Sequence, residues 1–362
     1  TNYISLSEKD TLLSLSNYAF DGFTFDVYGA LLNGAKLVVA DQATILHIGK
    51  LTEAIQKENI TVMFVTTALF NLLVDAGTEW MKGIRKVLFG GERSSVSHVK
   101  KAFAAMGPDR IIHVYGPTET TVFATFYPVN RIEDSAVSIP IGKPINETNA
   151  YILTENNRLQ PIGAVGELCL SGTGVSRGYL NRPELTAEKF VPHPFNSGET
   201  MYRTGDLARW LPDGNIDFIG RIDDQVKIRG HRIELGEIEE ELMRCQGVKE
   251  AVVIAKKSGN GDAALTAYVV PVRGAVVSNE EVRRQLARNL PAYMVPDAYI
   301  MLEELPLTAN GKVNRRLLPE ADGRPNPTEH RAPRNMTEEK LAIIWSEVLG
   351  RKQVGIHDDF FV

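Results

Sequence analysis

The chain has 362 residues, 43% of them hydrophobic, and its 40 basic and 45 acidic residues give a formal net charge of −5. This length and composition favour two or three domains with ordinary hydrophobic cores. The balanced charge argues against a nucleic-acid-binding or membrane-binding surface, and no apolar run reaches the length of a membrane span. Two cysteines and seven scattered histidines supply neither a disulfide framework nor zinc-ligand spacing. We therefore expect a cytoplasmic protein with no nucleic-acid or membrane partner.

The first third of the chain alternates strand-like and helix-like segments. Strands are expected at 35–40, 60–66 and 85–91, and a helix with amphipathic spacing is expected at 45–59. Such alternation predicts an α/β layer in which the loops after the strands carry the site.

The middle of the chain has a different texture. From 139 to 220, short strands are broken by Gly, Pro and Asn, which predicts a small all-β, barrel-like element. A helix at 236–245 and strands at 250–257 and 263–272 then predict a compact α+β unit that ends near residue 320.

The C-terminal part begins with a polar, proline-rich linker at 321–334. An amphipathic helix then starts at Thr337, with Glu339 in its first turn and Gly350 after its end. Only about 25 residues follow the linker, which is too few for an independent domain.

The stretch "HVYGPTETT" (113–121) contains one carboxylate, Glu119, in a tight loop between two apolar segments that read as strands. Gly-Pro with Thr and Glu is ordinary turn chemistry, so local spacing alone favours a solvated turn over a ligand site.

Six motifs resolve this choice when they are taken together. In chain order they are "YGPTETT" (115–121), "GELCLSGTGVSRGYL" (166–180), "YRTGDLARW" (202–210), "GRIDDQVKIRGHRIELGEIE" (220–239), "LPAYMVP" (290–296) and "LPLTANGKVNRRLLP" (305–319). This ordered set resembles the core motifs of amino-acid adenylation domains of nonribosomal peptide synthetases, in the acyl-adenylate-forming superfamily. The resemblance implies activation of an amino acid by ATP and Mg²⁺ as aminoacyl-AMP, followed by transfer to the phosphopantetheine thiol of a carrier domain.

The resemblance also implies a domain layout. Residues 1–221 would be an N-terminally truncated adenylation core, and 222–320 its C-terminal subdomain, with a hinge at Asp223. Residues 335–362 look like the first helix of a peptidyl carrier bundle, cut before the serine that would carry phosphopantetheine. The family's phosphate loop is missing upstream. We therefore expect a fragment of a multidomain synthetase that works with carrier and condensation domains.

Forming an acyl phosphate brings two anions together, so the protein must neutralise charge and align the reacting atoms. By resemblance, Glu119 would hold Mg²⁺, which favours one or two carboxylates plus phosphate oxygens. Lys312, at an Asn-Gly turn, would be the catalytic lysine that reaches the substrate carboxylate and the α-phosphate. The ATP or AMP site would comprise Gly91, Glu92, Tyr115, Gly116, Thr118, Asp206 and Arg221. His113 stands where the family often has asparagine, so the adenine contact of that asparagine is not carried over to this chain.

The substrate pocket follows from the segment "NYAFDGFTFDVYGALLNGAKLVV" (17–39), in which Asp21 matches the aspartate that binds the α-amino group. The lining would be Gly22, Phe25, Phe64, Leu88, Gly90, Val114, Val122 and Phe123. No polar side chain would face the substrate, so an aliphatic amino acid is expected, and Gly22 and Gly90 would leave room for a branched chain. As a set, these residues resemble the family's isoleucine pockets.

Two alternatives remain at this stage. An acyl-CoA or aryl-acid ligase of the same superfamily would have no use for the charge of Asp21. The second alternative is that the chain, as cut, is only a structural or interaction module without catalysis. The missing phosphate loop is the feature that keeps this alternative open.

Overall fold

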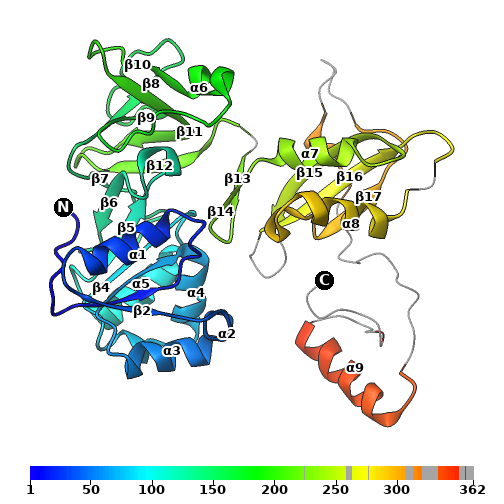
Figure 1. The fold of residues 1–362 in the computed structure, drawn as a ribbon, viewed down its shortest axis with the longest axis horizontal. Coiled ribbons are helices and arrows are strands. Elements are labelled where there is room, and N and C mark those ends of the chain that lie inside the picture. Colours follow the sequence, from blue (N-terminus) through cyan, green and yellow to red (C-terminus); the bar gives the residue numbers. More distant parts are fainter. Residues whose placement is uncertain are drawn as a thin grey trace. The chain divides into compact units, whose positions relative to one another are not determined.

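The computed structural model describes residues 1–223, 225–257, 263–275, 277–306, 313–319, 333–349 and 355. It divides into two compact units, Thr1–Asp223 with Arg229–His231, and Asp224–Ile228 with Arg232–Val362. Figure 1 shows the elements of each unit.

The first unit contains a seven-stranded mixed sheet, built within residues 1–144, all of which are described. Its order is β2-β1-β3-β4-β5-β6-β7, parallel from β2 through β5 and antiparallel beyond. The strands are β1 (Thr11–Ser14), β2 (Lys36–Val39), β3 (Val62–Thr66), β4 (Lys86–Gly90), β5 (Ile111–Tyr115), β6 (Thr125–Pro128) and β7 (Lys143–Pro144). This confirms the predicted α/β layer.

Successive side chains of a strand point to opposite faces of the sheet. Alternate residues of the parallel strands therefore pack into different hydrophobic clusters. In β4, Val87 and Phe89 belong to one cluster and Leu88 to another. Both faces are therefore buried, as parallel sheets require. The helices of this layer are α1 (Gly22–Leu31), α2 (Gln42–Ile45), α3 (Ile48–Lys57), α4 (Thr67–Asp75) and α5 (Val96–Met106).

The helix predicted at 45–59 is two helices in the structure. His47 is extended, and its ring accepts a hydrogen bond from the N–H of Lys50, which starts α3 as a new helix. The apolar spacing that motivated the prediction belongs to α3, whose Leu51 and Ile55 are buried four residues apart.

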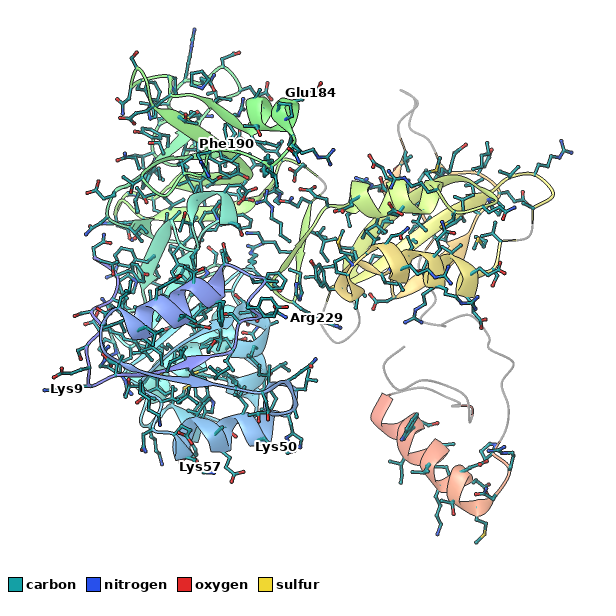
Figure 2. All side chains as sticks on the ribbon, in the orientation of Figure 1. Lys9, Lys50, Lys57, Glu184, Phe190 and Arg229 are labelled. Atoms are coloured by element: carbon teal, nitrogen blue, oxygen red, sulfur yellow. The ribbon has the colours of Figure 1, made fainter. Side chains whose placement is uncertain are left out.

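The predicted all-β element is present as a separate antiparallel sheet in the same unit, formed within residues 148–221, all of which are described. Its path is β10-β11-β9-β8, with β12 paired to β11. The strands are β8 (Thr148–Leu153), β9 (Gly166–Gly172), β10 (Phe190–Pro192), β11 (Thr200–Trp210) and β12 (Ile216–Arg221), and α6 (Pro183–Lys189) precedes β10. Figure 2 labels Glu184 on α6 and Phe190 at its end.

The second unit contains the three-stranded sheet β15-β16-β17, with strands β15 (Val248–Lys257), β16 (Ala263–Pro271) and β17 (Ala298–Met301). Helices α7 (Leu235–Met243) and α8 (Asn279–Asn289) contribute to its core, through Ile238, Leu242, Val282 and Leu286 among others. The α+β composition agrees with the prediction for this part of the chain.

Strands β13 (Val226–Ile228) and β14 (His231–Ile233) form a two-stranded ladder, and the turn Arg229–His231 is grouped with the first unit. Helix α9 spans Met336–Leu349, one residue earlier than its predicted start. The predicted linker at 321–334 lies outside the described residues except for its last two positions. Among the described helices, none combines the length and the apolar character needed to cross a bilayer.

Candidate active site

Asp21 occupies the N-cap position of α1 and is half-buried. Within the described part of the chain its carboxylate makes no side-chain capping hydrogen bond to the helix. The N-terminus of an α-helix favours a negative charge. The carboxylate is thus held at a position that favours its charge, and no described capping hydrogen bond ties it to the helix.

Three phenylalanines of the predicted lining pack on one another, edge to face or tilted. The ring centroids are 6.5 Å apart for Phe25 and Phe64, 5.4 Å for Phe25 and Phe123, and 5.1 Å for Phe64 and Phe123. Leu88 and Val114 are buried in the same core cluster, and Val122 packs against it. The sequence-predicted lining residues are therefore brought together from α1, β3, β4, β5 and the loop before β6.

The two glycines of the predicted lining are closely packed. A Cβ placed on Gly22 would lie 3.1 Å from Phe64 Cε1, and one on Gly90 would lie 2.1 Å from the backbone oxygen of Val114. Gly90 pairs with Val114 in the β4–β5 ladder. The structure therefore gives Gly90 a backbone reason: any side chain would collide with the neighbouring strand, whatever the substrate.

The loop that contains Glu119 is a short 3-10 turn, η2 (Thr118–Thr120), directly after β5. The next two residues, Thr121 and Val122, have φ values of 65° and 64°. Left-handed backbone at a β-branched residue is strained and tends to occur at functional sites. This turn is therefore not an ordinary solvated one.

Glu119 accepts a hydrogen bond on Oε1 from the hydroxyl of Tyr179, at 2.6 Å. Burial raises the pKa of Tyr179, and the hydrogen bond to Glu119 raises it further, so the phenol remains a donor. Tyr179 lies in the motif at 166–180, 60 residues further along the chain, but the sequence analysis assigned it no role and no contact with Glu119. We found no local pattern that would have predicted this contact.

No group of three or more His, Cys, Asp or Glu side chains converges on a possible metal position among the described residues. A single carboxylate nevertheless fits Mg²⁺, which is commonly bound by one or two carboxylates together with substrate phosphates. Glu119, with one oxygen fixed by a phenol, has the donor chemistry for that role.

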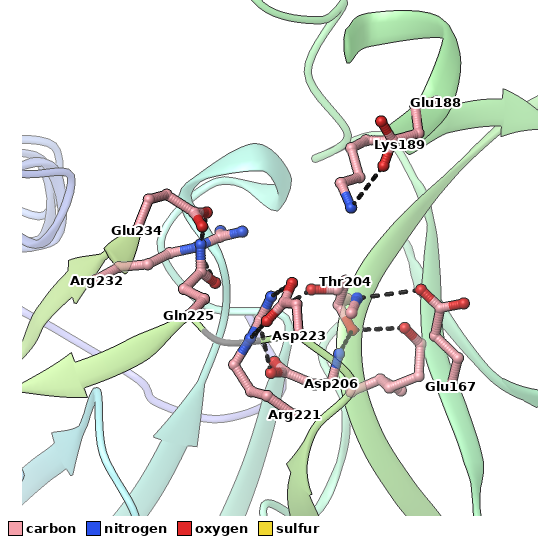
Figure 3. Close-up of polar contacts among 12 residues, drawn as sticks. Glu167, Glu188, Lys189, Thr204, Asp206, Arg221, Asp223, Gln225, Arg232 and Glu234 are labelled. Atoms are coloured by element: carbon pink, nitrogen blue, oxygen red, sulfur yellow. Dashed lines mark hydrogen bonds and ion pairs between the residues drawn. The ribbon is translucent and has the colours of Figure 1, made fainter. Parts of the chain in front are cut away.

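The predicted nucleotide residues Tyr115, Asp206 and Arg221 form one polar network with Asp223, part of which is drawn in Figure 3. The hydroxyl of Tyr115 donates to Asp206 Oδ2 at 2.5 Å, and Arg221 donates to Asp206 Oδ1 at 2.7 Å. Arg221 also holds both oxygens of Asp223, each at 2.6 Å.

Burial gives this network its importance, because Asp206 is only 2% exposed. A buried carboxylate without a partner costs several kcal/mol, and here Arg221 supplies the compensating charge. Burial raises the pKa of Tyr115 well above its usual value, and neighbouring Asp206 raises it further, which keeps the phenol protonated as a donor.

Asp206 lies inside strand β11, between Gly205 and Leu207, and the local sequence had suggested a strand-entry turn as its alternative environment. The pairing register of β11 with β9 shifts between Arg203 and Leu207, and the N–H of Gly205 donates to Glu167 Oε1 at 3.1 Å. The Asp206 carboxylate lies at this irregularity of the strand. The sequence analysis did not identify Glu167 as part of the site.

The remaining predicted nucleotide residues occupy loops after β4 and β5. Gly91 is exposed and has a φ of 95°, while Glu92 accepts a hydrogen bond from the N–H of Gly230. Gly116 is half-buried, and Thr118 is exposed. Lys312 lies outside the described residues, so its proposed catalytic role stays a prediction.

His113, the departure noted in the sequence, is 3% exposed. Its Nδ1 lies 2.7 Å from the backbone oxygen of Pro140, and its ring stacks on Phe89 with centroids 4.8 Å apart. It neighbours Val114 along β5 and therefore faces the opposite side of the sheet from the phenylalanines.

Comparisons with known proteins agree with these observations. Residues 1–180 match the AMP-binding enzyme family, and residues 237–312 match the AMP-binding enzyme C-terminal domain. Surfactin synthase subunit 3 of Bacillus subtilis (strain 168) is 60% identical over 99% of this chain, which covers 28% of that protein. Bacitracin synthase 1 of Bacillus licheniformis is 52% identical over 99% of this chain, which covers 7% of that protein. The chain thus spans a minor part of the length of these relatives.

A solved structure agrees as well. A holo nonribosomal peptide synthetase protein with adenylation and PCP domains, bound to a vinylsulfonamide inhibitor, superposes with a TM-score of 0.80. It is 32% identical, and the match covers 99% of this chain and 59% of that one. The fold, the site and these matches together place the chain in the AMP-binding enzyme family, among the adenylation domains of nonribosomal peptide synthetases.

Proposed function

We propose that this chain activates an L-amino acid, with L-isoleucine as best substrate, and passes the aminoacyl group to a carrier domain. The observation that carries the proposal is the half-buried carboxylate of Asp21 at the N-terminus of α1. It directly precedes Gly22, where an added Cβ would lie 3.1 Å from Phe64 Cε1 in an apolar wall of three phenylalanines. Such a carboxylate and apolar wall complement an ammonium and an aliphatic side chain that are attached to the same carbon, as in an α-amino acid.

In the first half-reaction, the amino-acid carboxylate attacks the α-phosphorus of ATP and pyrophosphate leaves. Asp21 would bind the α-amino group, and Asp206 the ribose hydroxyls. Glu119 would hold Mg²⁺, which when bound neutralises phosphate charge. Lys312 would contact the substrate carboxylate and the α-phosphate as negative charge develops.

In the second half-reaction, the thiol of a carrier domain's phosphopantetheine attacks the mixed anhydride, and AMP leaves. The relatives are synthases or synthase subunits by name, and the structural neighbour contains adenylation and PCP domains. The PCP domain of the neighbour supports a carrier domain as partner. We propose condensation domains as further partners and a cytoplasmic location.

The chemistry of the wall supports an aliphatic substrate, and the resemblance of the lining residues to isoleucine pockets supports isoleucine in particular. A polar side chain would be desolvated there without a partner, at a cost of several kcal/mol. Valine has one methylene fewer, which a hydrophobic pocket discriminates by about 1–3 kcal/mol, or roughly 10- to 200-fold. Valine and leucine should therefore be weaker but measurable substrates.

The test is amino-acid-dependent ATP–pyrophosphate exchange in the full-length protein with a panel of amino acids. Isoleucine should give the highest kcat/KM, and a charged or aromatic amino acid at the top would refute the pocket assignment. The 2-hydroxy acid analogue of isoleucine serves as the control for Asp21. Since it lacks the ammonium, equal exchange with that analogue would favour the acyl-CoA or aryl-acid ligase alternative.

The other alternative is a chain without catalysis. Binding of ATP, measured by calorimetry on the 362-residue chain, separates it from an active domain, and absence of binding would support the inactive reading for that chain alone.

A further inference from the structure

Residues 172–179, which follow β9, form a glycine-rich loop that packs directly on the turn containing Glu119. The N–H of Ser176 donates to the backbone oxygen of Glu119 at 2.8 Å, and the hydroxyl of Thr121 donates to the oxygen of Gly174 at 2.7 Å. A Cβ at Gly174 would lie 2.8 Å from the backbone oxygen of Thr120, so only glycine allows this approach. The glycine-rich loop therefore fixes the backbone of Glu119 and of the two residues after it.

The same loop ends at Tyr179, whose hydroxyl donates to Glu119 Oε1. Three neighbours hold this tyrosine. Its N–H donates to Thr186 Oγ1 of α6 at 2.9 Å, its ring packs edge to face on Phe190 with centroids 5.3 Å apart, and its oxygen lies 3.5 Å from the hydroxyl of the fully buried Tyr202. The donor is therefore fixed in space before any ligand arrives.

A glutamate side chain has three rotatable bonds. A carboxylate that ligates a metal must be held in one orientation to bind the metal tightly. Groups that hydrogen-bond a ligating carboxylate orient it, and their loss commonly weakens metal binding 10- to 100-fold. The hydrogen bond of Tyr179 to Oε1 fixes the rotation of the Glu119 carboxylate, and with it the direction of Oε2.

We propose that Tyr179 is a positioning residue that orients the Glu119 carboxylate toward Mg²⁺ bound to ATP, held in place by α6 and the glycine-rich loop. This inference rests on the proposed assignment of Mg²⁺ to Glu119. Tyr179 itself contacts no reacting atom in this scheme.

The experiment measures Mn²⁺ binding, with α,β-methylene ATP as the nucleotide, by electron paramagnetic resonance in the full-length protein. Tyr179→Phe removes only the hydroxyl and should weaken Mn²⁺ binding about tenfold. Its affinity for AMP without metal, measured by calorimetry, should match that of the wild type. Tyr151→Phe is the matched control, because Tyr151 packs on His193 and Phe195 elsewhere in the first unit and should leave both affinities unchanged.

A third variant, Glu119→Gln, separates this inference from the proposed function. If Glu119→Gln weakens Mn²⁺ binding while Tyr179→Phe stays within twofold of the wild type at an unchanged melting temperature, the positioning role is refuted alone. If neither variant changes Mn²⁺ binding, the metal role of Glu119 is refuted and the inference with it. Weakened binding in both, with Tyr151→Phe unchanged, supports the inference.

Discussion

Asp26 is a buried carboxyl group in α1 whose stability contribution should depend steeply on pH. It is 1% exposed, its Oδ2 accepts a weak hydrogen bond from the N–H of Ser16 at 3.4 Å, and its Oδ1 is buried without a hydrogen-bond partner among the described residues. Burial raises the pKa of Asp26 from 3.8 to about 7, and hydrogen bonds from Ser16, Ser14 and Leu15 oppose this only in part. At neutral pH the folded state therefore holds a carboxyl that resists ionisation.

The sign follows from proton binding. Between the unfolded pKa of 3.8 and the folded pKa of about 7, the folded state keeps a proton that the unfolded state has lost, so stability falls as pH rises. One pKa unit corresponds to about 1.4 kcal/mol, and a rise of about three units therefore amounts to roughly 4 kcal/mol, as an upper figure. Asp26→Asn is isosteric and does not titrate.

The assay is urea unfolding of the wild type and Asp26→Asn at several pH values between 4 and 8. We expect the wild type to lose up to roughly 4 kcal/mol relative to the variant over this range, with most of the change between pH 4 and pH 7. Parallel stability profiles for the two proteins would refute the reasoning.

Asp10→Asn provides a control of opposite sign in the same unit. Burial raises the pKa of Asp10, but hydrogen bonds from Arg85, Ser7 and Thr61 outweigh it, and the net pKa is lowered. Its stabilising effect should therefore be present above the unfolded pKa and be lost as pH falls through the folded value.

Three further predictions concern the site. Arg221→Lys should weaken AMP binding by roughly tenfold in calorimetry, because lysine cannot hold Asp206 and Asp223 together. The control, Arg209→Lys, alters a similar pair with Asp217 and should leave AMP binding unchanged. Equal effects of the two variants would contradict the assignment. Gly90→Ala should cost about 1–3 kcal/mol in urea unfolding because of the Val114 oxygen, whereas Gly83→Ala, with open space around it, should be nearly neutral. Asp223→Pro fixes φ at the proposed hinge, so adenylate formation should persist while carrier loading falls. The control is Asp223→Ala, which loses the same ion pair with Arg221. Similar carrier loading by both variants would argue against a hinge.

Local patterns predicted the elements well where one face or both faces of a segment are apolar. The buried strand "RIIHV" became β5, and the apolar spacing around Leu51 and Ile55 became α3. The break between α2 and α3 was missed because the side chain of His47 caps a helix, a role seldom taken by histidine.

The candidate site was only partly predictable. Its residues came from resemblance to a family, and the structure brings Tyr115, Asp206 and Arg221 into one network across about 100 residues of sequence. The contact of Tyr179 with Glu119 depends on how the glycine-rich loop crosses the turn after β5, which no local pattern encodes. Lys312 lies outside the described residues, so its catalytic role stays a prediction.

If Asp206 binds the ribose hydroxyls as proposed, its hydrogen bonds would have a consequence for which nucleotides are accepted. An ionised carboxylate offers about four lone-pair sites, and Tyr115 and Arg221 occupy one on each oxygen. Two sites then remain, which equals the number of hydroxyl donors on the 2′ and 3′ carbons of a ribose. A 2′-deoxyribose fills only one of them and leaves a buried acceptor unsatisfied. The Asp206 carboxylate would thus favour ribonucleotides over deoxyribonucleotides, because only a ribose supplies both hydroxyl donors.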